Sequence, residues 1–225
     1  MLPLPQSIGL FVVSPKEVKA WIEKNANLED MPCPTFKRVS IFPGFEDVCK
    51  LIGHGSNGTV YKAVDPQTYE VVAVKKLDLQ TPGAQAFAQK ERQMMSACNP
   101  HPNICRLRSV AYGPDEKSLV LVMDYADTDM RVVRDSRIVL PEADFRCLAT
   151  QLLRGVQHVH SKKIVHRDIK PANVLLTHKG SVQLADFGFA DTMRQGMWLQ
   201  NSPDSVVTLN YRPPELLLGS TEPHG

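Results

Sequence analysis

The chain has 225 residues, of which 43% are apolar and 22% are charged, and this composition is typical of a globular protein that can bury a core in one large domain or two small lobes. Lys and Arg number 26 against 24 Asp and Glu, and the resulting net charge of +2, without any block of like charge, argues against nucleic-acid or membrane partners. Five scattered cysteines without a C-x-x-C pair argue against a disulfide framework or a zinc site, and they predict an intracellular protein of the nucleus or cytoplasm.

Residues 1–44 are rich in proline and form an extension in front of the regular pattern. The run S-P-K-E at 14–17 is typical of a helix start, because serine can cap the helix, proline suits its first position and glutamate completes a capping box. A single apolar face follows, formed by Val18, Trp21 and Ile22. This pattern predicts a short helix that docks either on the domain or on a partner.

From residue 45 the apolar pattern changes to that of strands. We expect strands at 48–52, 59–64, 71–77 and 119–123. We expect helices at 82–97 and 141–160, and a hairpin whose strands, 174–176 and 182–184, flank a turn at Lys179-Gly180. A strand-rich first half with one helix, followed by a helical second half, predicts an α+β fold of two lobes with an antiparallel sheet in the first lobe.

A glycine-rich loop lies between the first two expected strands. Residues 53–60 read G-H-G-S-N-G-T-V, and glycines let a backbone approach phosphate groups closely and donate N–H groups to them. A tight hairpin or a dinucleotide-binding fingerprint would also contain such glycines. The fingerprint needs a helix directly after its last glycine, whereas the residues after Gly58 are β-branched and strand-like. A dinucleotide-dependent oxidoreductase is therefore disfavoured.

Two charged residues fall at positions that the apolar pattern would bury. Lys75, in V-A-V-K at 72–75, shares its strand face with apolar neighbours, and Glu91 lies on the apolar face of the expected helix. Because burying a lone charge is costly, the two residues could satisfy each other as an ion pair. The alternative is that Lys75 extends to solvent and Glu91 is a surface charge.

The stretch 165–176 reads V-H-R-D-I-K-P-A-N-V-L-L, and D-F-G follows at 186–188 across the expected hairpin. Asn173 and Asp186 offer the oxygen ligands that Mg²⁺ prefers. Asp168 can accept the proton of a substrate hydroxyl, and Lys170 can neutralise charge on a transferred phosphoryl group. The four motifs together, in this order, predict phosphoryl transfer.

These motifs resemble those of protein kinases, over residues 45–219. H-P-N-I at 101–104 and V-V-T-L-N-Y-R-P-P-E at 206–215 are most similar to the cyclin-dependent-kinase-like (CMGC) serine/threonine kinases. The resemblance implies ATP and Mg²⁺ as cofactors, and protein substrates with Ser or Thr, proline-directed. It also implies an N-lobe at 45–123, a hinge at 124–129 and a C-lobe from 130 to 225.

The resemblance further implies a role for individual residues. Lys75, Glu91, Asp168 and Lys170 would be catalytic, and Asn173 and Asp186 would hold the metal. The nucleotide would contact Gly53, Gly55, Gly58, Val60, Ala73, Lys75, Asp124, Ala126, Asp129 and Leu175. Four side chains would stack as a regulatory spine, namely Met95, Leu107, His166 and Phe187.

Several positions depart from the family pattern. The cyclin-contacting P-S-T-A-I-R-E helix is here A-Q-K-E-R-Q-M at 88–94, so a cyclin or another regulatory subunit stays an open expectation. Ser202 and Ser205 are the hydroxyls nearest the usual activating threonine, and Asp204 could partly replace its phosphate. Of the basic residues that hold that phosphate, Arg167 is kept, whereas Lys90 and Asp191 stand at the other positions. Fewer partners would then be available to a loop phosphate. Asn210 and Pro213 replace the usual Trp and Ala of the wall that receives the residue after the phosphorylated one.

The chain stops soon after the P-P-E motif, where kinases of this type continue with further helices, so we expect an incomplete C-lobe. Two functions remain open from the sequence. The intact motif set predicts an active kinase, and the short C-lobe favours a non-catalytic fragment that binds a nucleotide or a partner.

Overall fold

The computed structural model describes residues 50–55, 58–65, 68–113, 116–136, 139–193, 208–212 and 214–217. The extension with its expected helix lies outside the described residues. So do the possible phosphorylation sites, Ser202 and Ser205, and the two other loop positions singled out above, Asp204 and Pro213.

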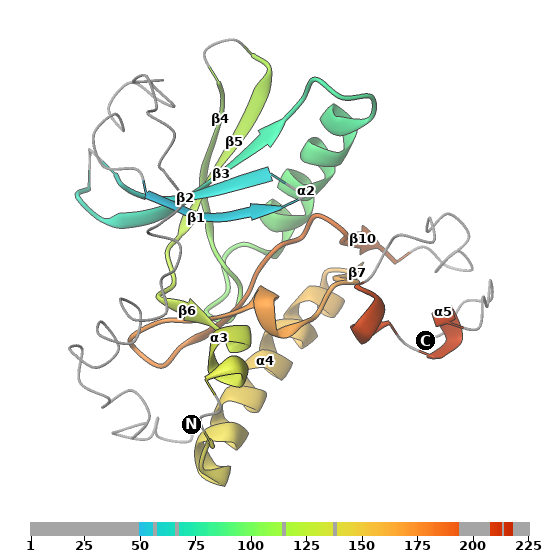
Figure 1. The fold of residues 1–225 in the computed structure, drawn as a ribbon. Helices are drawn as coiled ribbons and strands as arrows, with labels where there is room; N and C mark the ends of the chain where they lie inside the picture. The colour runs from blue at the N-terminus through green and yellow to red at the C-terminus, as the bar shows by residue number, and fades with distance from the viewer. Residues whose placement is uncertain are drawn as a thin grey trace.

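The first half of the described chain is an antiparallel sheet with one long helix beside it (Figure 1). The five strands lie in the order β1-β2-β3-β5-β4, and each is paired with its neighbours in antiparallel register. Their bounds are β1 Lys50–Gly55, β2 Gly58–Val64, β3 Val71–Asp78, β4 Leu107–Tyr112 and β5 Ser118–Asp124. β5 is buried along almost its whole length, as its uninterrupted apolar sequence predicts.

Strand β4 was not foreseen in the sequence. It lies at the edge of the sheet opposite to β1, its register is interrupted between Leu107 and Ser109, and Arg108 and Ser109 break any apolar alternation. Only Leu107 of this strand is buried, so its apolar pattern is weak. The other four strands lie within a few residues of the expected ranges.

Helix α2 spans Ala84–Cys98, close to the predicted 82–97. It begins after Gly83, whose φ of 80° is a left-handed conformation that glycine adopts without strain, and it ends at Asn99, before a proline that cannot continue the helix. Its buried face carries Ala88, Met94, Met95 and Cys98 together with the charged Glu91. An acidic residue in this apolar stripe requires a partner inside the protein.

The second half is helical, with short strands between the helices. Helix α4, Glu142–Ser161, is the longest element, and none of the described helices is both long and apolar enough to cross a membrane. The predicted hairpin is present as β8 and β9, and β8 also pairs with β6. The bounds are β6 Thr128–Asp129, α3 Met130–Asp135, β7 Ile164–Val165, η1 Pro171–Asn173, β8 Val174–Leu176, β9 Val182–Leu184, β10 Asp191–Thr192, η2 Leu209–Tyr211 and α5 Pro214–Leu217.

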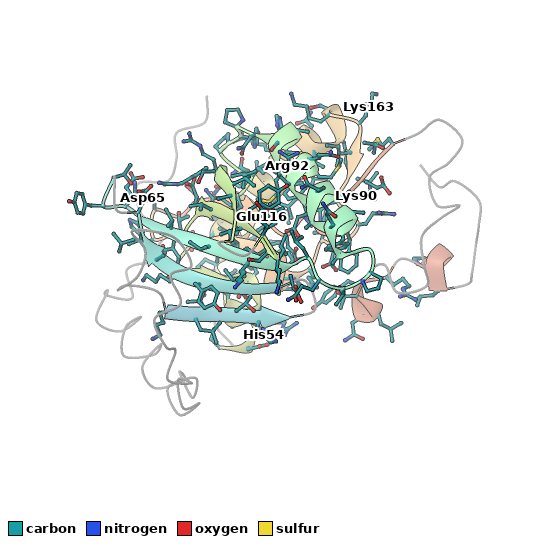
Figure 2. The ribbon with its side chains drawn as sticks, turned by 90° about the horizontal axis from the view of Figure 1, so that it is seen from above. His54, Asp65, Lys90, Arg92, Glu116 and Lys163 are labelled. Carbon is teal, nitrogen blue, oxygen red and sulfur yellow. The ribbon has the colours of Figure 1, made fainter. Side chains whose placement is uncertain are left out.

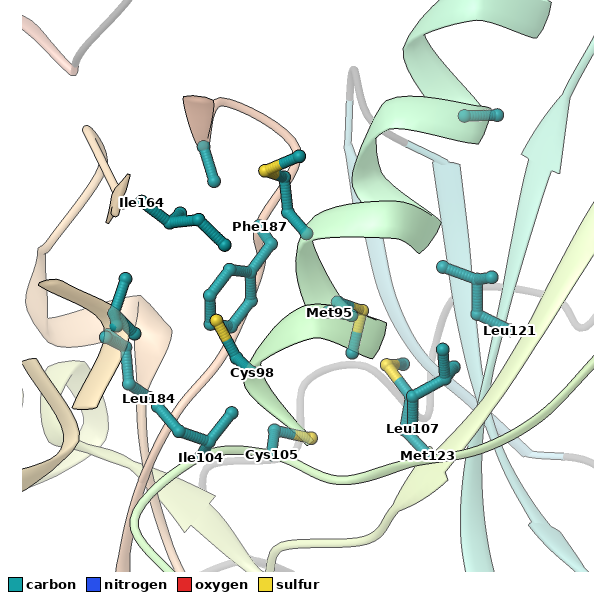
Figure 3. Close-up of a cluster of buried hydrophobic side chains, with 14 of the residues drawn as sticks. Met95, Cys98, Ile104, Cys105, Leu107, Leu121, Met123, Ile164, Leu184 and Phe187 are labelled. Carbon is teal, nitrogen blue, oxygen red and sulfur yellow. The ribbon is translucent and has the colours of Figure 1, made fainter. Parts of the chain in front are cut away.

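The segment after α2 joins the two halves. Ile104 forms a parallel bridge with Leu184 of β9, and backbone hydrogen bonds of 2.9 Å run from Cys105 N to Leu184 O and from Leu184 N to Asn103 O. One apolar cluster continues across this junction, and Figure 3 shows Phe187 between Ile164 on one side and Met95 of α2 on the other. The helix of the first half and the strands of the second half therefore share a core.

Buried polar groups also hold α4 against this junction. The Asn103 side chain donates to Val182 O at 3.0 Å and to Gln151 Oε1 at 3.3 Å, and Gln151 Nε2 donates to Gly180 O at 3.1 Å. Gly155 of α4 lies so close that a Cβ atom there would stand 2.7 Å from Asn103 O. Glycine is needed here because of the close approach of a backbone carbonyl.

We expect Gly155→Ala to lower the free energy of unfolding. The overpacking cost of about 1–3 kcal/mol exceeds the gain of about 1 kcal/mol that alanine brings to a helix interior. A thermal melt of the 225-residue chain measures the change. Gly55→Ala is the matched control, because a Cβ atom there meets nothing within 4 Å. A midpoint at or above that of the parent would contradict the packing argument.

Candidate active site

Lys75 lies in the middle of the sheet, on β3 between Val60 of β2 and Leu121 of β5, and its exposed fraction is 6%. Its ammonium group donates to Glu91 Oε1 at 2.6 Å and to Asp186 Oδ1 at 2.9 Å. The structure thus brings together the two residues that the sequence suggested as a pair, and it adds a third. Lys75 does not extend to solvent, and Glu91 is 1% exposed.

Lys75 attracts both carboxylates of this cluster, but the carboxylates repel each other: burial and then the charge of Asp186 raise the pKa of Glu91 in spite of Lys75. Burial alone would lower the pKa of Lys75, but the negative charges of Glu91 and Asp186 outweigh it and raise that pKa above its ordinary value. For Asp186, burial would raise the pKa, but the charge and hydrogen bond of Lys75 hold it below the usual range. At neutral pH the ammonium and the Asp186 carboxylate are therefore both charged.

Asp168 is the centre of a second cluster, and it is 1% exposed. Asn173 Nδ2 donates to its carboxylate at 2.9 Å and to its backbone carbonyl at 2.8 Å, and Lys170 Nζ lies 2.7 Å from Oδ2. Thr208 Oγ1 donates to Asp168 Oδ1 at 2.8 Å and accepts from Lys170 at 2.9 Å. Oδ1 of Asp168 thus accepts a hydrogen bond from a hydroxyl group within reach of the lysine, and in this structure that hydroxyl belongs to Thr208.

Sequence reasoning did not place Thr208 in this cluster, because it lies far along the chain from Asp168. The signal that could have found it is its place in V-V-T-L, just before the tyrosine and arginine of the P-P-E motif. The spacing of that motif does not by itself show that its threonine contacts Asp168, which lies 40 residues earlier in the chain.

His166 holds the backbone that presents Asp168. Its Nδ1 accepts the Asp168 N–H at 3.3 Å, so the other ring nitrogen carries the proton and donates to Ala185 O at 3.0 Å. Burial lowers the pKa of His166, which keeps the ring in this neutral form. The ring also packs against Phe187, with 4.8 Å between the centroids. The four residues named as a stack, Met95, Leu107, His166 and Phe187, are all buried.

Asn173 belongs to the Asp168 cluster and Asp186 to the Lys75 cluster, and Ala185 N, next to Asp186, donates to Asn173 O at 2.9 Å. Both side chains offer oxygen atoms, which is the donor chemistry that suits Mg²⁺. Among the described residues no three His, Cys, Asp or Glu side chains gather at a metal-binding spacing. The set therefore fits an ion that completes its shell with phosphate oxygens and water, and not a cage made by protein alone.

The expected nucleotide-binding residues come from both halves. Gly55 and Gly58 pair at the end of the β1–β2 hairpin, next to Gly53, and the φ of 117° at Gly58 requires glycine. Ala73 belongs to the shared core, and Val60 and Leu175 pack against it from β2 and β8. These three apolar side chains come from two strands of the sheet and one strand of the second half, and their contact with adenine stays a prediction.

The residues expected to form a hinge, 124–129, are engaged in local contacts. The Asp124 carboxylate accepts from Arg108 at 2.5 Å, and Lys62 stands over the ring of Tyr125, 4.4 Å from its centroid. Asp129 caps helix α3, since its Oδ1 accepts from Arg131 N at 2.8 Å and from Val132 N at 3.1 Å. Ribose contact by Asp129 stays a prediction, and the observed task of its carboxylate is to start the helix.

Comparison with known proteins gives the family. The protein kinase domain model matches residues 47–225. The chain belongs to the protein kinase family. Its kinase domain is 40% identical over 173 residues to cyclin-dependent kinase 10 of Homo sapiens, which covers 76% of the chain and 47% of that relative.

Plant kinases are similar as well. Two proteins of Arabidopsis thaliana, each named as a probable serine/threonine-protein kinase, are 38% identical to the kinase domain. The first alignment covers 174 residues, 76% of the chain and 24% of the relative, and the second covers 181 residues, 79% of the chain and 31% of the relative. The chain spans about half the length of the cyclin-dependent kinase relatives it matches, and less of the plant proteins.

We expect Glu91→Gln to lower the free energy of unfolding by about 2 kcal/mol. Removing one partner of a buried ion pair costs about 3–5 kcal/mol, and the cost is smaller here because Asp186 still neutralises Lys75. Chemical denaturation of the parent and variant measures the difference. Glu142→Gln is the control, since its ion pair with Arg146 is 76% exposed on both sides. Equal losses of unfolding free energy in the two variants would show that the buried Lys75 cluster stabilises the fold no more than an exposed ion pair does.

Proposed function

We propose that this chain is an ATP-dependent serine/threonine protein kinase of the cyclin-dependent-kinase-like type, which transfers the γ-phosphoryl group of ATP to serine or threonine of proteins. The observation that carries the proposal is the Asp168 cluster, in which one buried carboxylate is held by Lys170, Asn173 and Thr208. Membership of the protein kinase family supports it, as do relatives named as serine/threonine kinases.

Each group of the Asp168 cluster has a proposed task. The substrate hydroxyl would donate a hydrogen bond to Asp168, as Thr208 does in this structure. Its oxygen would form a bond to the γ-phosphorus while the bond to the leaving ADP oxygen breaks, and Asp168 would accept the proton. Lys170 would offset negative charge on the transferred group. Such catalysis depends on position and electrostatics.

The proposed cofactor residues lie around these groups. Lys75, held by Glu91, would bind the phosphates of ATP, and Asn173 and Asp186 would hold Mg²⁺, which would neutralise phosphate charge. The glycines at 53, 55 and 58 would cover the phosphates. The adenine would lie between Val60, Ala73 and Leu175, at the backbone of Asp124 and Ala126, with Asp129 near the ribose.

We propose substrates in which proline follows the phosphorylated residue, on the resemblance of residues 206–215 to cyclin-dependent kinases. Tyr211 in this segment accepts a hydrogen bond from Arg134 of α3 at 2.9 Å, which fixes the segment beside the helix. The name of the human relative also states cyclin dependence. We correspondingly propose that a cyclin or another regulatory subunit binds this chain at α2.

We expect MgATP to raise the melting temperature of the parent chain and to have little effect on Asp186→Asn. At a ligand concentration one hundred times the dissociation constant, binding adds about 2.7 kcal/mol to stability. Differential scanning fluorimetry with ATP and Mg²⁺, each alone and together, measures the shift. An equal shift in parent and variant would exclude Asp186 as a metal ligand.

We expect Asp168→Asn to reduce phosphoryl transfer by about 100-fold or more, because the base that accepts the hydroxyl proton is lost. The assay uses radiolabelled ATP and two peptides that differ only in proline or alanine after the serine. Asp78→Asn, at an exposed strand end, is the control.

The outcomes separate the functions. Preference for the proline peptide would support proline direction, and equal use of both peptides would reject it. Stabilisation by MgATP without transfer to any peptide would instead support a nucleotide-binding protein without catalysis. Undiminished transfer by Asp168→Asn would overturn the role of this residue.

A further inference from the structure

Asp191 joins two parts of the kinase domain that lie far apart in the sequence. Its Oδ2 accepts from Lys90 Nζ of α2 at 2.7 Å and from Arg167 Nη2 at 3.1 Å, and its Oδ1 accepts from Thr192 N at 2.8 Å. Figure 2 shows Lys90 on α2, and Figure 1 shows β10, which contains Asp191, beside β7. One carboxylate thus receives a cation from each half.

The two cations stand next to the two groups on which the proposed chemistry depends. Lys90 directly precedes Glu91, which holds Lys75, and Arg167 directly precedes Asp168. Arg167 has a φ of 63°, a conformation that costs energy outside glycine, and its Nε donates to Phe189 O at 2.7 Å. Each cation is thus attached to the backbone that carries a residue of the proposed active site.

The backbone of Asp191 is itself fixed. It pairs with Val165 in the short β7–β10 ladder, and Phe189 nearby packs edge-on against Phe87 of α2 with 6.2 Å between the centroids. The carboxylate is consequently presented from a defined place. Burial alone would raise the pKa of Asp191, but the hydrogen bond from Lys90 and the charge of Arg167 lower it, so the group is ionised at neutral pH.

We propose that Asp191 is a positioning residue, whose carboxylate ties α2 to the catalytic loop without a phosphate on the chain. The proposal rests on the proposed function and deepens it. In the family that the sequence resembles, basic side chains gather to hold a loop phosphate, whereas here one of those positions carries the anion itself. Two cations and one carboxylate leave less positive charge for a phosphate to neutralise.

Removing the carboxylate charge does more than remove an attraction. Lys90 and Arg167 would face each other without a shared anion, and the Arg167 side chain, 14% exposed, has little water to solvate it. Lys90 and Asp191 are 37% and 40% exposed, so solvent screens their contribution to stability. The expected effect is therefore on the position of α2 and on turnover, and only slightly on unfolding.

The test compares Asp191→Asn, which keeps the shape and removes the charge, with Asp191→Glu, which keeps the charge. We expect kcat for peptide phosphorylation to fall about 10- to 100-fold in Asp191→Asn, with peptide KM changed by less than about threefold. Its melting temperature should fall by less than about 4 °C. Asp191→Glu should recover most of the activity, and Glu142→Gln, an exposed ion pair elsewhere, should match the parent.

A double variant tests the charge argument directly. Because Lys90 repels Arg167 once Asp191 is neutral, Lys90→Met combined with Asp191→Asn should be no slower than Asp191→Asn alone. Additive losses in the double variant would contradict a shared tie.

A second measurement does not depend on activity. Hydrogen–deuterium exchange should show faster uptake in the α2 peptide of Asp191→Asn and parent-like uptake in Asp191→Glu. Unchanged uptake would overturn the proposal, with or without turnover. If the parent neither transfers phosphate nor is stabilised by MgATP, the proposed function fails. Faster deuterium uptake in Asp191→Asn would in that case still support the contact of Asp191 with Lys90 and Arg167 as the link that holds α2.

Discussion

The buried ammonium group of Lys75 is the constraint on which the rest of the site depends. A charge at the centre of a sheet cannot be left alone, because its desolvation costs several kcal/mol unless carboxylates compensate it. The two that do so come from α2 and from the segment after β9, at 2.6 and 2.9 Å. One lysine thus sets the position of α2 and of the D-F-G motif relative to the sheet. Apolar packing alone is not directional, so it would define these positions less sharply.

Apolar and backbone contacts make that arrangement rigid. Phe187, the residue after Asp186, is fully buried among side chains of both halves and touches the ring of His166. His166 accepts the backbone N–H of Asp168, so Asp186, the proposed metal ligand, and Asp168, the proposed base, are linked through two neighbouring rings. The bridge between Ile104 and Leu184 then fixes the strand that leads into D-F-G. An error in any one contact would displace several reacting groups together.

Much of this fold could be predicted from the sequence, and the failures have physical causes. The pairing of Lys75 with Glu91 followed from two charges on apolar faces, and the hairpin at 174–184 from its turn. Strand β4 was missed because Arg108 and Ser109 interrupt its apolar pattern and only Leu107 is buried. The resemblance placed Lys90, Arg167 and Asp191 around a loop phosphate, but it did not predict that Asp191 itself binds the two cations. The contact of Thr208 with Asp168 was not predicted, since it joins segments distant in the chain and no periodicity encodes it. Asp129 was expected at the ribose, and its sequence position alone did not reveal that it caps α3.

Consecutive residues explain how one helix can serve two contacts. In an α-helix neighbouring side chains point about 100° apart, so Glu91 faces the sheet while Lys90 faces β10. Arg167 and Asp168 divide their tasks in the same way, the first toward Asp191 and the second toward Lys170. Glu91 and Asp168, the two buried groups of the proposed chemistry, are thus each adjacent in sequence to a cation that contacts Asp191. The Asp191 carboxylate connects the partly exposed Lys90 to the largely buried Arg167, and through this contact it would couple the helix to the segment that carries Asp168.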